Sequence, residues 1–238
     1  MQLYNAPWQM LKMVEGQKSA DQRELVHVLQ EIEQKNEKSA INLVNALFLS
    51  SSSQSLDKVC LNIFVKIGDR RSLSLLYKKF PTPQAISMSL LPSYINVLAH
   101  LGEKDELDVL ARVASIFGGL YRGELLAALE SVVAKVGPVD VSYEVVSGLQ
   151  KLYEVTEPRE RIRLIQLAQR MNNDLMISIM LCGLEAEDET VRKAAISALG
   201  EHGSETAQRE LVRAFRKEED EDVLQEFEQW IFPVAQVA

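Results

Sequence analysis

Long apolar runs, cysteine, histidine and aromatic residues are all scarce in this sequence. No apolar stretch approaches the roughly 20 residues needed to cross a bilayer, so we expect no membrane span. The N-terminus has neither a basic start nor a small-residue cleavage site, which predicts no secretory signal. The two cysteines, Cys60 and Cys182, lie far apart in apolar segments and are expected to be buried, reduced structural thiols. Together these features predict a cytoplasmic protein.

Residue patterns that carry chemistry are also missing. The three histidines, His27, His100 and His202, are isolated from one another and from cysteine. The one glycine cluster, FGGLYRGE at 117–124, lacks the spacing of a phosphate loop and is expected to be a hairpin turn. Pairs of Asp and Glu occur only in charge runs, which are usually solvated. We therefore expect no enzyme activity, no catalytic residue, no metal and no cofactor.

Negative charge is concentrated in the last quarter of the chain. Residues 185–238 hold fourteen Asp and Glu against six Lys and Arg, so the whole formal net charge of −8 lies there. An acidic protein repels phosphate, which disfavours a nucleic-acid partner. Two basic segments, 57–80 and 157–170, keep a nucleic-acid-binding repeat array as an alternative. They lack the interleaved aromatic residues on which bases stack.

What the sequence does contain is helix-forming residues arranged in short amphipathic segments. In residues 187–200, EDETVRKAAISALG, Asp188 is placed to cap a helix N-terminus and Gly200 to end the helix in left-handed geometry. The apolar residues between them recur at helical spacing: Val191, Ala194, Ala195, Ala198 and Leu199. The segment therefore predicts one complete helix.

The same type of stop recurs along the chain. The predicted stops are Asn36, Gly68, Gly102, Gly137, Asn172 and Gly200, and neighbouring ones are 28–35 residues apart. The predicted helices are 6–15, 21–35, 39–50, 55–67, 70–80, 84–101, 104–117, 121–136, 140–154, 158–171, 173–184, 188–199, 204–217 and 220–231. One hairpin cannot bury its apolar face alone, so neighbouring hairpins must stack. We predict an all-α solenoid of about six antiparallel hairpins, forming one continuous domain over 1–238.

The motif D-x-x-V-R-x-x-A-x-x-A-L-G at 188–200 resembles the HEAT repeat, in the short bacterial form also found in phycobilisome-lyase-type repeats. The match is good over residues 184–217, and the upstream hairpins keep only the length and the stop. The resemblance implies a HEAT-like superhelix in which Asp188 and Arg192 form a structural ladder between adjacent repeats. It also implies a non-catalytic scaffold, adaptor or assembly factor that grips a partner protein. The repeat type leaves an accessory subunit of a bilin lyase as an alternative.

The two ends of the chain offer candidate partner-binding residues. The N-terminal segment 1–19 is apolar and includes Tyr4 and Trp8. It either caps the first hairpin or docks on a partner or a second copy, which would make a homo-oligomer. Residues 218–238 are expected to form an acidic capping helix. Its carboxylates either keep the end soluble or dock a basic protein partner: Glu218, Glu219, Glu221 and Asp222.

Overall fold

The computed structural model of the protein describes the backbone of residues 19–232 and the side chains of residues 25–232. Within these residues all regular structure is helical, with twelve α-helices, α2 to α13, and no strand. The predicted all-α class is confirmed. No helix in this range combines the length and the apolarity that crossing a bilayer requires. The predicted helix at 6–15 lies outside the described residues.

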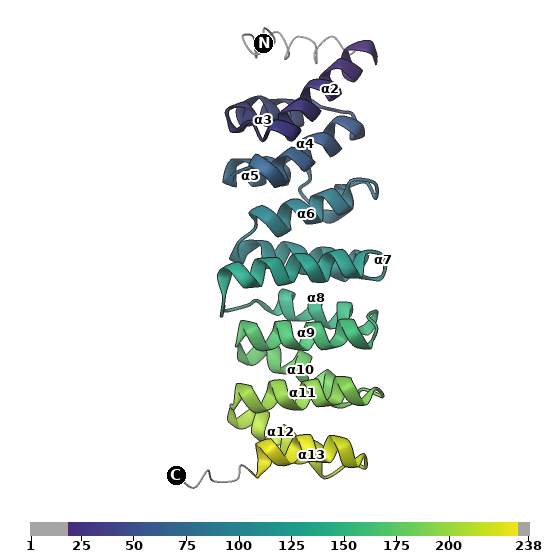
Figure 1. Cartoon of the computed structure of the whole chain (residues 1–238), viewed down its shortest axis with the longest axis vertical. Coiled ribbons are helices and arrows are strands. Elements are labelled where there is room, and N and C mark those ends of the chain that lie inside the picture. Colours follow the sequence, from purple (N-terminus) through teal and green to yellow (C-terminus); the bar gives the residue numbers. More distant parts are fainter. Residues whose placement is uncertain (1–18, 233–238) are drawn as a thin grey trace. The chain divides into compact units, whose positions relative to one another are not determined.

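The contacts of the chain divide it into two compact units, residues 1–102 and 103–238. Unit 1 contains α2 (Ser19–Lys35), α3 (Ile41–Ser50), α4 (Gln54–Ile67), α5 (Arg70–Lys79) and α6 (Leu91–Leu101). Within it α4 packs against both α2 and α6, and α3 packs against α5 (Figure 1). Unit 1 is thus a two-row stack of helices. One continuous domain over 1–238 stays a prediction.

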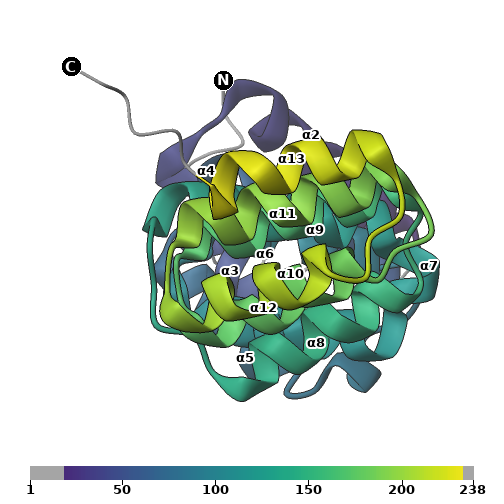
Figure 2. The same cartoon turned by 90° about the horizontal axis from the view of Figure 1, so that it is seen from below.

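Unit 2 is likewise a two-row stack. Its helices are α7 (Lys104–Val136), α8 (Tyr143–Glu154), α9 (Pro158–Met171), α10 (Ile177–Leu184), α11 (Glu189–His202), α12 (Glu205–Phe215) and α13 (Glu221–Ile231). Seen along the stack, α9, α11 and α13 lie in one row and α8, α10 and α12 in the other (Figure 2). Row A is defined here as α9, α11, α13 and the second half of α7 (122–136). Row B is α8, α10, α12 and the first half of α7 (104–120).

The helix α7 is itself a hairpin, broken at Tyr121 where the backbone leaves helical geometry (φ −129°, ψ 32°). Contacts along its two halves advance in the same direction as along α8 and α9. The pairs are Asp108 with Ser142 and Gly118 with Leu152 in the first half, and Arg122 with Glu157 and Glu130 with Arg163 in the second. The first half therefore runs parallel to α8 and the second to α9, and the chain reverses between them (Figure 1). The break falls within the predicted turn at 117–124.

Most helices begin where the sequence places a polar cap before an apolar stripe. Side-chain caps at these starts are Asp69, Ser142, Asp188, Ser204 and Asp220. Four helices, α3, α4, α6 and α10, begin without such a cap, and α6 differs most from its predicted range 84–101 because it begins only at Leu91. Pro92 has no backbone N–H to donate and fits the first turn of a helix, so the helix starts just before it. Residues 83–85 form a separate 3-10 turn.

The predicted left-handed stops are confirmed at three positions and wrong at three. The confirmed residues with positive φ are Asn36 (50°), Gly137 (68°) and Asn172 (47°). Gly68 and Gly102 have φ of −63° and −68°, which is extended backbone. The N-cap residue of the next helix follows each of these two glycines directly. An extended residue there leads the chain from one helix straight into the next, so no left-handed geometry is needed.

Gly200 is the third wrong stop, because it lies inside α11 and the helix continues to His202. Gly203, with φ 68° and ψ 4°, is the left-handed residue that ends it. Gly200 is required for a different reason: a Cβ built on it would overlap the indole ring of Trp230. It therefore lets α13 approach α11 closely.

Polar contacts between repeats repeat the period that the sequence predicts. The contacts and their sequence separations are Asn45 with Ser72 (27), Tyr153 with the carbonyl of Cys182 (29), Gln169 with Glu201 (32) and Glu130 with Arg163 (33). Each contact therefore joins one repeat to the next. Stacking of adjacent repeats, rather than long-range closure, is the organising principle of both units.

Candidate functional site

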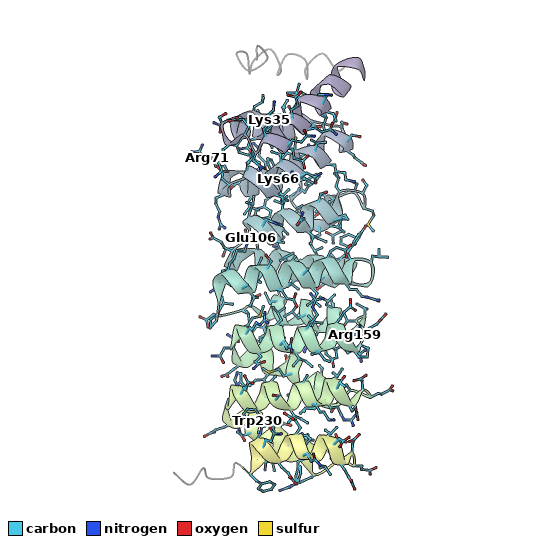
Figure 3. All side chains as sticks on the ribbon, in the orientation of Figure 1. Lys35, Lys66, Arg71, Glu106, Arg159 and Trp230 are labelled. Carbon is cyan, nitrogen blue, oxygen red and sulfur yellow. The ribbon has the colours of Figure 1, made fainter. Side chains whose placement is uncertain are left out.

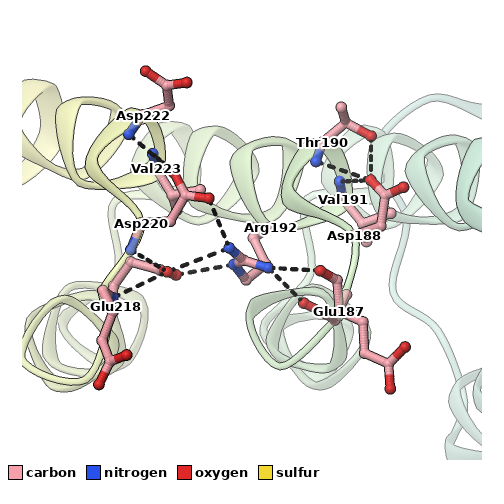
Figure 4. A network of polar contacts seen from close by, with 11 residues as sticks. Glu187, Asp188, Thr190, Val191, Arg192, Glu218, Asp220, Asp222 and Val223 are labelled. Atoms are coloured by element: carbon pink, nitrogen blue, oxygen red, sulfur yellow. Dashed lines mark hydrogen bonds and ion pairs between the residues drawn. The ribbon is translucent and has the colours of Figure 1, made fainter.

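Arg192 joins α11 to the turn that precedes α13 (Figure 4). Its Nε and Nη2 donate to the two carboxylate oxygens of Glu218 at 2.9 and 3.3 Å. Its Nη1 donates to the backbone carbonyls of Ala186 and Glu187 at 3.0 and 2.9 Å. The side chains of Arg192 and Glu218 are only 15% and 12% exposed. A two-pronged contact of this kind fixes geometry as well as charge.

Asp188 does not form a ladder with this arginine but closes the N-terminus of its own helix. Its carboxylate accepts from the backbone N–H groups of Thr190 and Val191 at 2.9 and 3.2 Å and from the Thr190 hydroxyl (Figure 4). The Thr190 hydroxyl, with smaller help from the two amides and from Arg192, holds the pKa of Asp188 below its usual value. Asp188 therefore caps the helix, and Arg192 makes the contact between repeats.

The four carboxylates predicted to dock a partner are not equivalent. Glu218 is tied to Arg192, and it also accepts from the backbone amides of Glu219 and Asp220 at 3.2 and 3.1 Å. Glu219, Glu221 and Asp222 are exposed at the start of α13. Nothing in the structure tests whether these residues bind a partner. Tyr4 and Trp8, the other predicted docking residues, lie outside the described residues.

Carboxylates meet where α11 and α13 begin. Oxygen atoms of Glu189, Asp220 and Asp222 lie within 4.8 Å of one another, close enough to share a cation. Asp220 also caps α13 through the amides of Asp222 and Val223 (Figure 4). The positive ends of two helix dipoles favour negative charge here, and that role alone explains the cluster.

The histidines and cysteines lie in separate surroundings. His27, His100 and His202 belong to three different helices, α2, α6 and α11. Cys60 is fully buried, and burial raises the pKa of its thiol to about 12. Cys182 is exposed, so the expectation of a buried thiol is wrong there, although desolvation of its sulfur still raises the pKa of the thiol. A protonated thiol is a poor nucleophile and a poor metal ligand, which favours the structural interpretation of both cysteines.

Several cations of the two basic segments, 57–80 and 157–170, make contacts within the fold. The engaged residues are Lys66 with Glu33 at 3.2 Å, Lys79 with Asp57 at 2.6 Å, Arg163 with Glu130 at 2.6 Å, and Arg161 stacked 5.1 Å from the ring centre of Tyr153. Lys58, Arg71, Lys78, Arg159 and Arg170 remain exposed, and Arg71 and Arg159 project outward from α5 and the start of α9 (Figure 3). The internal pairs reduce the charge that these segments could offer to a phosphate backbone.

Large apolar side chains are exposed mainly on one row of unit 2. Those on row B helices or at their ends are Ile116 (44% exposed), Leu120 (69%), Tyr143 (78%) and Val155 (42%). Among the described residues, row A exposes one such side chain, Phe232 (59%), at the C-terminal end of α13. Sequence reasoning missed this difference. The available signal was apolar residues that fall off the buried stripe of their helices, such as Tyr143 directly after the cap of α8.

A groove lies between α10 and α12 of row B. It encloses about 280 Å³. Its lining residues are Leu181, Leu184, Glu185, Glu210, Arg213, Ala214, Lys217 and Glu218. The apolar members come from the facing sides of the two helices, and charged side chains surround them. A groove of this composition can hold a few side chains of another chain rather than a buried cofactor.

The sequence comparison identifies the repeats. Residues 140–230, from the start of α8 into α13, match the family model for HEAT repeats. Over these residues the chain is similar to HEAT repeats. HEAT repeats generally mediate protein–protein interaction and are typically non-catalytic. The match extends upstream of the motif at 188–200 to repeats that lack it. Neither the curated proteins nor the solved structures gave a match.

Proposed function

We propose that the protein is a non-catalytic adaptor or assembly factor that binds a partner protein on the row B face of unit 2. The observation that carries this proposal is the set of four exposed apolar side chains on row B, against one, Phe232, at the end of row A. Apolar surface that stays exposed on a folded chain is commonly covered by a partner. The similarity of residues 140–230 to HEAT repeats supports the same mode of action.

Leu120 and Tyr143 are the strongest candidates for anchors in such an interface. They are 69% and 78% exposed, so the fold gains little from their apolar atoms. Aromatic and large aliphatic side chains dominate the energetic centre of protein interfaces. We propose that these two residues become buried when the partner binds.

The test is affinity capture from a lysate of the source organism, with identification of the bound proteins by mass spectrometry. The full chain is compared with the double variant Leu120→Asp, Tyr143→Asp. The control places the same substitution on row A, at the exposed Ala127 and Ala134. We expect proteins that bind the wild type and the control and are lost from the row B variant. Identical captured proteins for both variants would contradict the proposal.

The acidic end remains a second candidate surface, for a basic protein partner. It rests on the exposed Glu219, Glu221 and Asp222, because Glu218 is engaged by Arg192. Replacing the three exposed residues by Gln or Asn should weaken binding to such a partner and flatten its salt dependence. Unchanged affinity and salt dependence would leave them as a solubilising cap. A cytoplasmic location and a homo-oligomer likewise stay predictions.

A further inference from the structure

Acidic residues are almost absent from a large part of unit 1. Residues 38–102 contain seven Lys and Arg and only two acidic residues, Asp57 and Asp69. Asp57 is buried and pairs with Lys79 at 2.6 Å. Asp69 caps α5, where its carboxylate accepts from two backbone amides at 2.9 and 3.1 Å. Although the whole chain has a net charge of −8, this part of it is basic.

Exposed positive charge lies along one side of α5. Arg71, Ser74 and Lys78 are all exposed, and their spacing of three and four residues places them on the same face of the helix. We call these three residues the α5 stripe. Within the described residues, neither of its cations has an ion-pair partner. Arg71 projects outward from the helix (Figure 3), and seven residues of helix separate it from Lys78 by about 10 Å.

The neighbouring helix α3 adds no charge to this surface. Its sequence, INLVNALFLS, holds no charged residue. The two helices lie side by side and run in the same direction. Asn45 accepts from the Ser72 hydroxyl at 3.1 Å, and farther along both helices the Phe48 carbonyl accepts from Lys79 at 2.5 Å. The residues that α3 exposes are uncharged: Asn42, Leu49 and Ser50. No carboxylate of α3 therefore offsets the charge of the α5 stripe.

Helix stability explains only one of the two cations. Lys78 lies in the last turn of α5, where it complements the negative end of the helix dipole. Arg71 lies in the first turn, where the dipole disfavours positive charge, and no acidic residue accompanies it in that turn. The N-cap Asp69 offsets part of this unfavourable effect. A ligand that carries negative charge gives the Arg71 side chain a role that the fold does not.

From this unpaired charge and its spacing we infer that the α5 stripe binds an acidic segment of a protein partner. Arg71 and Lys78 each meet one carboxylate. An extended chain advances about 3.4 Å per residue, so two carboxylates three residues apart match the separation of about 10 Å between the cations. The stripe belongs to unit 1 and the row B face to unit 2. The inference therefore goes beyond the proposed function and does not depend on it.

A protein segment fits the α5 stripe better than nucleic acid does. Affinity for a phosphate backbone rises with the number of phosphates that cations neutralise, and the stripe offers two unpaired cations. It also contains no aromatic side chain on which a base could stack. The net charge of −8 repels a long polyanion, whereas a short acidic segment carries few charges.

The experiment is selection of a random peptide library, each peptide about twelve residues long, against the full chain. Counter-selection against the double variant Arg71→Glu, Lys78→Glu removes peptides that bind elsewhere. We expect the remaining peptides to be rich in Asp and Glu, with two of these residues three positions apart. Basic or uncharged peptides, or none above background, would overturn the inference.

Matched variants locate the bound peptide. The best peptide is synthesised with a fluorescent label, and its affinity is measured by anisotropy. Arg71→Glu with Lys78→Glu should lower the affinity about tenfold. The control, Arg159→Glu with Arg170→Glu, reverses two exposed cations of α9 and changes the net charge by the same amount. It should change the affinity less than about twofold. Equal losses for the two variants would mean that only total charge matters, and the inference would be wrong.

Melting temperatures separate a binding role of Arg71 from a structural one. Because an acidic residue in the first turn suits the helix dipole, Arg71→Glu should keep or raise the melting temperature while it weakens peptide binding. A lower melting temperature with unchanged affinity would make Arg71 structural and would contradict the inference. The affinity of the peptide for the wild type should also fall as salt rises, because exposed charges are screened.

A labelled single-stranded oligonucleotide tests the other class of ligand. If it binds more tightly than the best peptide and the double variant loses it, the stripe binds nucleic acid and the inference falls. The proposed function fails separately, through the variant at Leu120 and Tyr143. If that variant captures the same proteins as its control while the stripe variant loses the peptide, the proposed function falls and this inference stands.

Discussion

Units 1 and 2 stack their hairpins with different polar chemistry. In unit 1 the Lys79 ammonium donates to Asp57 at 2.6 Å and to the carbonyls of Phe48 and Ser51 at 2.5 and 2.8 Å. All three of its N–H donors are thereby used inside the fold, and the side chains of Lys79 and Asp57 are only 15% and 6% exposed. In unit 2 the exposure of the corresponding cations varies, because Arg163 is 41% exposed and Arg192 is 15% exposed.

The ion pairs of the two units differ in how much they cost to break. A buried ion pair is costly to break, because the remaining charge has no water to solvate it. A surface pair can open at little cost. Unit 1 therefore contains a fully engaged buried pair, whereas unit 2 combines one largely buried joint, at Arg192, with more exposed ones, such as that of Arg163.

The largest expected effect is at the buried pair of unit 1. Lys79→Met leaves the Asp57 carboxylate and two carbonyls without their donor, which should lower the free energy of unfolding by about 3–5 kcal/mol. The matched control is Lys78→Met, since Lys78 is the exposed neighbour on the same helix. Urea unfolding followed by circular dichroism measures both. Similar losses for the two variants would contradict the special role of Lys79.

An intermediate effect is expected at the joint between α11 and α13. Arg192→Met removes a two-pronged contact whose partners are 15% and 12% exposed, and should destabilise unit 2 by about 2 kcal/mol. Arg122→Met breaks a more exposed contact, to Glu157 and Glu160, and should cost less than about 1 kcal/mol. Equal losses of unfolding free energy for the two variants would show that burial does not determine how much each contact contributes to stability.

A smaller effect is expected at the surface pair of Arg163 and Glu130. Arg163→Met should lower the free energy of unfolding by less than about 1 kcal/mol, and the loss should shrink in high salt. The measurement is urea unfolding at two salt concentrations, with Glu130→Gln as the partner control. A loss as large as that of Lys79→Met would remove the contrast between the units.

The smallest perturbation compares the two cysteines. At neutral pH a chromogenic disulfide reagent should label Cys182 first, because Cys60 is buried and its pKa is raised to about 12. Labelling of Cys60 should appear only when unit 1 opens, and should therefore accelerate in Lys79→Met. Both thiols reacting at one rate in the wild type would show that unit 1 is not the tighter of the two.

The sequence predicts the helices well because their signals are local. Apolar spacing and a capping residue such as Asp188 lie within one segment, and the structure places most helix bounds within a few residues of the prediction. The glycine stops were harder, because the conformation of Gly68 depends on how soon the next helix begins. Gly200 was missed for a related reason. Only glycine fits at this position because Trp230, thirty residues away in the sequence, occupies the space of a side chain.

Candidate binding residues were predicted less well than the helices. The acidic run around Glu218 looked uniform in the sequence, and only the fold shows that Arg192 engages this one carboxylate. The groove between α10 and α12 arises from two helices that belong to different hairpins. Its composition cannot be read from either helix alone. Surfaces formed between repeats depend on packing, whereas the repeats themselves depend on periodicity.

The cross-repeat contacts have a mechanical consequence. Each of them, such as Glu130 with Arg163 or Gln169 with Glu201, joins only neighbouring repeats, so these contacts do not tether distant repeats to one another. Strain applied at one end is therefore shared among successive joints in series. A small rotation at every joint adds up along the stack, and the curvature of the row B face changes while each joint stays closed. The flexibility of unit 2 is therefore set by the stiffness of the individual contacts between its repeats.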